Sequence, residues 1–137
     1  MKKESYIIEM LRLLENNHVY STHEFEKDLL KLVNTNVKKF IKNFYHDITR
    51  KRFEDLNRFE ILKLTRTQKR MLNNKKLYRY EYRENSNLKC IYITDDENNI
   101  DEVLLLCAFN EDGDKEKGKN SYNDNIERAI RIYLSTL

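Results

Sequence analysis

The sequence predicts an α+β domain in which N-terminal helices and a C-terminal helix pack on a small antiparallel sheet. Apolar residues recur at helical spacing before residue 56 and again after residue 121, and three β-prone runs lie between these regions. The breaks between the runs are short, so neighbouring strands should be antiparallel, because a parallel crossover needs about a dozen residues. At 137 residues, the chain is predicted to form a single domain, 1–137, with a core of its own.

The three β-prone runs predict a meander. In Leu77–Arg83 tyrosines alternate with charged residues, which is typical of a half-buried strand. Lys89–Thr94 is rich in β-branched and aromatic residues. Val103–Phe109 is apolar almost throughout, so we expect it to be the innermost strand, covered on both faces. The breaks at 84–87 and 97–101 are rich in Asn, Asp and Glu, and Asn and Asp favour turns.

The chain before the meander is predicted to be mainly helical. Thr22 or Ser21 is expected to cap one of these helices, whose first turn holds Glu24 and Glu26. The expected elements are a helix over 4–16, a short edge strand over 18–22, a helix up to Val33, a long helix from Val37 to about Asp55, and a less regular helix over Leu56–Leu72 with a break near Thr65–Thr67.

The C-terminal region is predicted to be a polar loop followed by a helix. The loop 110–120 holds both glycines of the chain and several lysines. Ile126, Ala129, Ile130 and Tyr133 then follow the i, i+3, i+4, i+7 rule of an amphipathic helix. Ser121, with an Asp three residues later, resembles a capping box at its start.

Composition excludes several function classes. The three histidines are scattered without metal-ligand spacing, and there is no glycine-rich phosphate loop or GxSxG motif, so no metal or cofactor is expected. Cys90 and Cys107 lie within predicted strands and are expected to be small core residues. The N-terminal segment is too short and too charged for a membrane span or a secretory signal, which predicts a soluble cytoplasmic protein.

Charge is unevenly distributed, although the net charge is only +3. Residues 38–89 are rich in Lys and Arg, whereas 95–114 is rich in Asp and Glu. A local basic face suggests an anionic partner such as nucleic acid, and a solvated helix face is the alternative.

Basic and aromatic groups gather on the predicted sheet. Alternation places Arg79, Glu81 and Arg83 on one face of the first strand, and Lys89 follows the turn, near Arg83. Such groups could bind a phosphodiester, with guanidinium groups stabilising charge on the phosphate and Glu81 acting as a general base. The alternative is a solvated cross-strand ion ladder. Further candidates are three loop lysines and a tyrosine that could stack on a base, Lys115, Lys117, Lys119 and Tyr122.

Four segments, in their order along the chain, resemble the RelE/HigB superfamily of toxins from type II toxin–antitoxin pairs. These are Leu77-Tyr-Arg-Tyr-Glu-Tyr-Arg83, Leu88-Lys-Cys-Ile-Tyr92, the strand end Ala108-Phe109 with the lysine-containing loop, and Ile126-Glu-Arg-Ala129. Residues 18–137 correspond to the toxin core, and residues 1–17 resemble a helical extension added to it. Lys89 stands where the family usually has Arg, and Leu88 where it usually has Tyr.

The resemblance implies a RelE/ParE-like fold and a metal-independent endoribonuclease that cleaves mRNA on the ribosome and inhibits translation. It implies catalytic roles for Arg83 and Lys89, and RNA binding by Arg79 and the lysines at 115, 117 and 119. Glu81, as the general base, and Tyr122, as the stacking ring, complete the predicted catalytic and RNA-binding sets. It also implies a cognate antitoxin protein as partner. The toxin would then form a hetero-oligomer with the antitoxin, or a homo-oligomer of its own.

Two alternatives stay open on the sequence. One is a toxin with another target, such as DNA gyrase. The other is a non-catalytic relative that binds a protein partner through the apolar side of residues 4–14, which would then be exposed. Sequence-specific DNA binding by Val37–Asp55 is a weaker option, because no clear helix-turn-helix pattern supports it.

Overall fold

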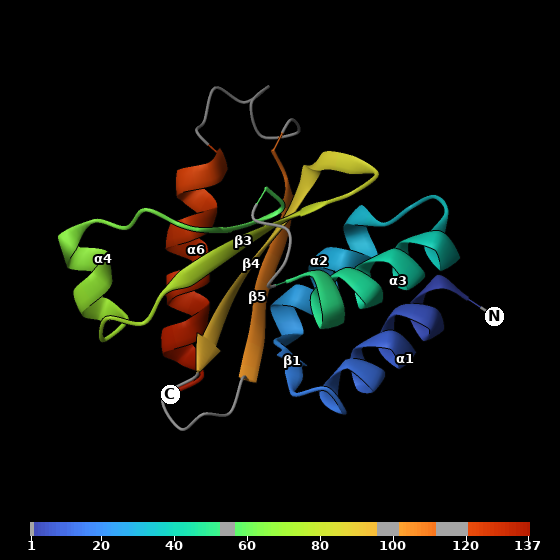
Figure 1. Cartoon of the computed structure of the whole chain (residues 1–137), viewed down its shortest axis with the longest axis horizontal. Helices are drawn as coiled ribbons and strands as arrows, with labels where there is room; N and C mark the ends of the chain where they lie inside the picture. Colours follow the sequence, from blue (N-terminus) through green and yellow to red (C-terminus); the bar gives the residue numbers. More distant parts are fainter. Residues whose placement is uncertain (1, 53–56, 96–101, 112–120) are drawn as a thin grey trace.

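The computed structural model describes residues 2–52, 57–95, 102–111 and 121–137 (Figure 1). Thr22 begins the second helix as predicted, because its Oγ1 atom accepts a hydrogen bond from the Phe25 N–H at 3.0 Å. In chain order, the elements are α1 (Lys3–Glu15), β1 (Val19–Ser21), α2 (His23–Leu32), α3 (Val37–His46), the π-helical turn η1 (Asp47–Lys51), β2 (Phe59–Ile61), α4 (Arg66–Met71), β3 (Leu77–Tyr82), β4 (Asn85–Asp95), β5 (Glu102–Asn110) and α6 (Ser121–Ser135).

Within the described ranges, the strands form one mixed sheet in the order β1-β5-β4-β3-β2. The predicted meander is confirmed, because β3, β4 and β5 pair in antiparallel fashion. The sheet as a whole is not antiparallel, since β1 pairs with β5 in parallel. The central strand is β4, so the prediction that Val103–Phe109 is innermost was wrong, although β5 also has a neighbour on each side.

Helices cover both faces of the sheet. Helices α1, α2 and α3 pack on one face, where Tyr80 and Tyr92 are buried, and α6 packs on the other, against Ile91 and Leu106 (Figure 1). This double cover explains why β5 is apolar at consecutive positions. The α+β class is therefore confirmed, and the face opposite the N-terminal helices is not open, because α6 lies on it.

Helix α2 closes the edge of β5 beyond the short strand β1. The Thr22 hydroxyl donates to the Leu106 carbonyl at 2.8 Å, and the Asp28 carboxylate accepts from the Ala108 N–H at 2.9 Å. Asp28 also accepts from the Arg128 guanidinium of α6 at 2.8 Å, so it joins α2, β5 and α6. None of the helices in the described ranges is long and apolar enough to cross a membrane.

Helix α1 is part of the core. Ile7, Met10, Leu11 and Leu14 are buried in the cluster shared with α2, α3 and the sheet. Leu13 is the large apolar side chain of α1 that stays exposed, at 50%. The expectation of an exposed apolar side over residues 4–14 was therefore wrong, because that side packs against the rest of the domain.

Three predicted boundaries differ from the structure. The helix expected over Leu56–Leu72 was wrong in its first part, because Phe59–Ile61 is a strand beside β3. The helix Arg66–Met71 begins after Thr65, at the break expected near Thr65–Thr67. The long helix from Val37 changes to π-helical hydrogen bonding at Asp47, and residues 53–55 lie outside the described residues. The first hairpin turns at 83–84, so 85–87, expected in the turn, already belong to β4.

Candidate functional site

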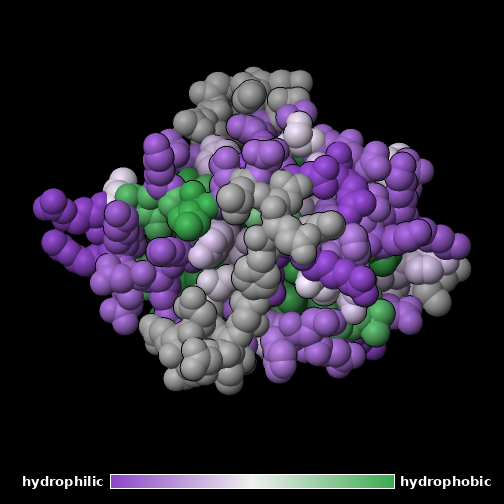
Figure 2. Space-filling view, viewed as in Figure 1, coloured by the Kyte–Doolittle hydropathy of each residue, from purple (hydrophilic) through white to green (hydrophobic). Residues whose placement is uncertain are grey.

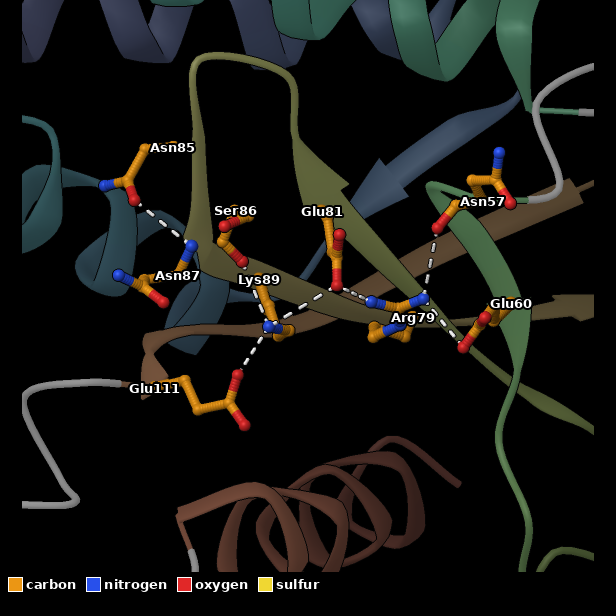
Figure 3. Close-up of polar contacts among 9 residues, drawn as sticks. All are labelled: Asn57, Glu60, Arg79, Glu81, Asn85, Ser86, Asn87, Lys89 and Glu111. Carbon is orange, nitrogen blue, oxygen red and sulfur yellow. Dashed lines mark hydrogen bonds and ion pairs between the residues drawn. The ribbon is translucent and has the colours of Figure 1, made fainter.

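Charged side chains from four parts of the sheet meet on the face that α6 covers. We call this group the Arg79–Lys89 cluster and define it by Glu60 of β2, Arg79 and Glu81 of β3, Lys89 of β4 and Glu111, directly after β5 (Figure 3). Glu81 lies opposite Lys89 in the β3–β4 register. The sequence predicted the pair Arg79 and Glu81 on one face, because every second residue of a strand points to the same side.

Arg79 is the most enclosed member of the cluster. Its guanidinium contacts the Glu81 carboxylate, the Glu60 carboxylate at 2.7 Å and the Asn57 carbonyl at 3.3 Å, and its side chain is 6% exposed. Its Nε atom is buried and has no hydrogen-bond partner among the described residues. A buried donor without a partner costs about 1–3 kcal/mol, so the enclosure of Arg79 is not fully compensated by its contacts.

Lys89 lies on the neighbouring strand with its ammonium group pointing at the same carboxylate. Its Nζ atom lies 2.5 Å from Glu111 Oε2 and 3.5 Å from Glu81 Oε1, and it donates to the Ser86 carbonyl at 3.0 Å. The side chain is 7% exposed. Glu81 is therefore held between two cations, which keeps its carboxylate in one position.

The cluster is not a basic surface in this structure. Three carboxylates accompany two cations, and every one of these charges has a partner of opposite sign (Figure 3). Buried charges need such partners because an unpaired charge in the protein interior is strongly unfavourable. An anionic ligand can therefore reach Arg79 or Lys89 only by taking the place of a carboxylate.

Tyr122, in the first turn of α6, belongs to the same neighbourhood. Its ring meets Phe109 edge to face at 5.9 Å between ring centroids. Burial raises the pKa of Tyr122 to about 12, the positive charge of Arg79 lowers it, and the negative charges of Glu60 and Glu111 raise it. The phenol is therefore protonated at neutral pH and can donate a hydrogen bond beside the cluster.

Arg83 does not join the Arg79–Lys89 cluster. The expectation that Arg79, Glu81 and Arg83 share one face was wrong, because the strand register shifts between Glu81 and Tyr82 and the chain turns at 83–84. Arg83 instead contacts the Asp47 carboxylate, and its Nη2 atom lies 3.3 Å from His46 Nδ1. Lys89 and Arg83 were expected to lie close together, but the two side chains contact different partners.

Asp47 is a buried acidic residue that was not among the candidates predicted from the sequence. It is 0% exposed, and it accepts hydrogen bonds from Arg83 and, at 2.5 Å, from the Tyr80 hydroxyl. Burial and the hydrogen bond to Asp47 raise the pKa of Tyr80. A sequence signal existed: Asp47 falls three residues after Phe44 and seven after Phe40, on the apolar stripe of the helix, where an acidic residue is out of place.

Within the described residues, the remaining residues singled out in the sequence contribute no contact to the Arg79–Lys89 cluster. Lys115, Lys117 and Lys119, as well as the side chain of Ser121, lie outside the described residues. Cys90 and Cys107 are free and buried, as predicted for core residues. Burial raises the pKa of both thiols, that of Cys107 to about 12. In the part of the chain that the structure describes, no three His, Cys, Asp or Glu side chains form a group that could hold a metal ion.

Comparison with known proteins identifies no relative: no family model, no curated protein and no solved structure matches the chain.

Proposed function

We propose that the chain is a toxin that cleaves mRNA without a metal ion, as its resemblance to the RelE/HigB superfamily implies, with the Arg79–Lys89 cluster as its site. One observation carries the proposal: two buried cations on adjacent strands converge on the Glu81 carboxylate, beside a protonated tyrosine. Metal-independent RNA cleavage requires a base, positive charge at the phosphate and a proton donor, and this group contains residues of each type.

The proposed reaction is the attack of a ribose 2′-hydroxyl on the adjacent phosphate. Glu81 takes the 2′-hydroxyl proton as the new O–P bond forms, and Arg79 and Lys89 stabilise the negative charge on the phosphate oxygens. The bond between phosphorus and the 5′-oxygen then breaks, and this oxygen receives a proton. Tyr122, a neutral donor beside the cluster, supplies this proton, and the proposal gives it this role in place of the base stacking expected from the sequence.

Access to the site depends on the acidic residues. Glu111 forms an ion pair with the ammonium group of Lys89. Glu60, which is 58% exposed, forms one with the guanidinium of Arg79. An RNA phosphate must replace at least one of them, and Glu60 is the easier one to displace because water already reaches it. The protein therefore holds its cations in a neutralised form until the polyanion binds.

The same pairing favours a second candidate, a non-catalytic binding module. In this second candidate, every cation of the cluster keeps its carboxylate partner, and the cluster serves to join β2, β3, β4 and the end of β5. The apolar side of α1 cannot be the binding surface of such a module, because it is buried in the core.

Expression in a bacterial host separates the two candidates. If the protein acts as a toxin in the cytoplasm, the host should stop growing and new 5′ ends should appear in translated mRNA. Both effects should be lost in Lys89→Gln. Arg12→Gln, an exposed change on α1, is the matched control and should keep both effects. Arrest without new 5′ ends would move the target away from mRNA, with DNA gyrase tested next, and normal growth with a folded protein would favour the binding module. A cognate antitoxin, if encoded beside this chain, should relieve the arrest when it is expressed together with the toxin.

A further inference from the structure

The chain leaves the sheet after β2, forms α4 and returns as β3, and this excursion is basic throughout. We call residues 61–76 the α4 arm. The arm carries six basic residues and no acidic residue (Lys63, Arg66, Lys69, Arg70, Lys75 and Lys76). Figure 1 shows α4 standing away from the body of the domain, on the side remote from α1 and α3.

The arm contains a groove of about 620 Å³. Its apolar lining consists of Ile61, Leu62 and Leu64, and Ile61 is 55% exposed. Figure 2 shows hydrophobic atoms gathered beside the position of α4, with hydrophilic side chains around them. The remaining lining residues are polar or basic: Lys63, Lys69, Asn74, Lys75 and Lys76.

The lysines of the groove differ from the cations of the Arg79–Lys89 cluster. Lys63, Lys69 and Lys76 are exposed, and no ion pair within the described residues involves any of them. No acidic side chain of the described residues lines the groove, so Lys63, Lys69 and Lys76 face no carboxylate within this lining.

The groove is held in shape by its surroundings. Leu62 and Leu72 are buried in the cluster under α6, and Gln68 donates to Glu127 of α6 at 2.6 Å. Thr65 and Gln68 form a capping box at the start of α4, and Asn73 and Asn74 take left-handed backbone angles that turn the chain back toward β3. Anchors at both ends of the arm therefore favour a groove that exists before any partner binds.

We propose that this groove is the docking site for an acidic, aliphatic segment of a partner protein. Aliphatic side chains of such a segment would contact Ile61, Leu62 and Leu64, while its carboxylates would face the lysines. Single-stranded nucleic acid fits the groove less well, because none of the described residues that line it is aromatic, and bases bind proteins largely by stacking on aromatic rings. The proposal does not depend on RNA cleavage by the Arg79–Lys89 cluster.

The test is binding of a fluorescein-labelled peptide of four Glu-Leu-Ser repeats to the full chain, followed by fluorescence anisotropy. The paired variant Lys63→Glu/Lys76→Glu should weaken binding by about tenfold or more, which equals about 1.4 kcal/mol. Ile61→Asp should weaken it as well, because it places a charge on the apolar lining. The control Lys27→Glu/Lys42→Glu makes the same charge change on exposed lysines of α2 and α3 and should bind like the unchanged chain.

Two further probes complete the test. A peptide of Lys-Leu-Ser repeats should not bind, and oligouridylate should bind more weakly than the acidic peptide. Equal weakening in both paired variants, no binding of the acidic peptide, or tighter binding of oligouridylate at this groove would each overturn the proposal. Circular dichroism of every variant verifies that the fold is retained.

Discussion

The ammonium group of Lys89 lies 2.5 Å from the Glu111 carboxylate, at the point where β5 ends. Lys89 is buried and Glu111 is partly buried, so salt screens this pair less than a pair on the open surface. Any phosphate that binds Lys89 competes with Glu111 for the same ammonium group. The proposed site is therefore controlled by a carboxylate of its own chain.

The first prediction follows from this competition. Glu111→Gln removes the competing charge and leaves Lys89 paired with Glu81, so affinity for oligouridylate should rise by about tenfold, equal to about 1.4 kcal/mol. Fluorescence anisotropy with labelled oligouridylate measures the change, and Glu9→Gln on the exposed side of α1 is the control. An unchanged affinity in Glu111→Gln would mean that RNA does not reach Lys89.

The second prediction concerns Arg83. Asp47 is fully buried, and Arg83 is its cationic partner, so Arg83→Ala should destabilise the fold by roughly 3–5 kcal/mol. Urea unfolding followed by circular dichroism measures this loss. Asp47→Asn combined with Arg83→Ala should recover part of it, because the buried charge is then gone. A loss below about 1 kcal/mol in the single variant would show that Asp47 finds another partner.

This second prediction changes how loss of toxicity in Arg83→Ala should be interpreted. A variant that is largely unfolded loses activity whatever the role of the arginine. Glu81→Gln is a better probe of the chemistry, because it removes one charge at similar side-chain size and leaves Arg79 paired with Glu60, Lys89 with Glu111 and Asp47 with Arg83.

The third prediction separates a core helix from an added one. Leu14 of α1 is 0% exposed and Leu13 is 50% exposed. Leu14→Ala should therefore cost roughly 2–5 kcal/mol in the free energy of unfolding, whereas Leu13→Ala should stay within about 0.5 kcal/mol. Deletion of residues 1–16 should give an unfolded or aggregated chain. A soluble, folded truncation would contradict the packing of α1 described above.

The fourth prediction is a pH dependence at Tyr122. Burial raises the pKa of this phenol to about 12, whereas a tyrosine in an unfolded chain titrates near 10. Between these values the unfolded chain has lost the proton and the folded chain has kept it, so stability from Tyr122 is complete below pH about 10 and is lost as pH rises through about 12. Tyr122→Phe should reduce the fall in the free energy of unfolding across this range.

The control for this measurement is Tyr20→Phe, at an exposed tyrosine of β1. Ultraviolet absorbance of tyrosinate follows the titration directly, and chemical unfolding at each pH follows the stability. Identical pH curves for Tyr122→Phe and the unchanged chain would contradict the raised pKa of this partly buried phenol.

The regular elements were predictable where the sequence has a clear period. The stripes of α1, α2 and α6 extend over several turns, and the tyrosine alternation in β3 sets its two faces. Strand β2 has only three residues, which is too short for a period of two to be recognised. Leu56, Phe59 and Leu62 also recur every third residue, which imitates a helix.

The site was predictable only in part, for a similar reason. Alternation along one strand placed Arg79 and Glu81 together, whereas Lys89, expected near Arg83, lies opposite Glu81. The register shift after Glu81 is invisible in a pattern of alternating residues, so Arg83 was placed on the wrong face. Glu60 and Glu111 come from distant parts of the sequence, and only the sheet order brings them to the cluster.

The most direct test of the central claim is cleavage of 5′-labelled mRNA on translating ribosomes by the purified chain. If the Arg79–Lys89 cluster is the catalytic site, the unchanged protein and Arg12→Gln should cut at the same positions. Glu81→Gln should then be slower by on the order of 10²–10⁴-fold, the usual effect of losing a general base. Cleavage by Glu81→Gln at the rate of the unchanged protein, or no cleavage by the folded unchanged protein, would contradict the account.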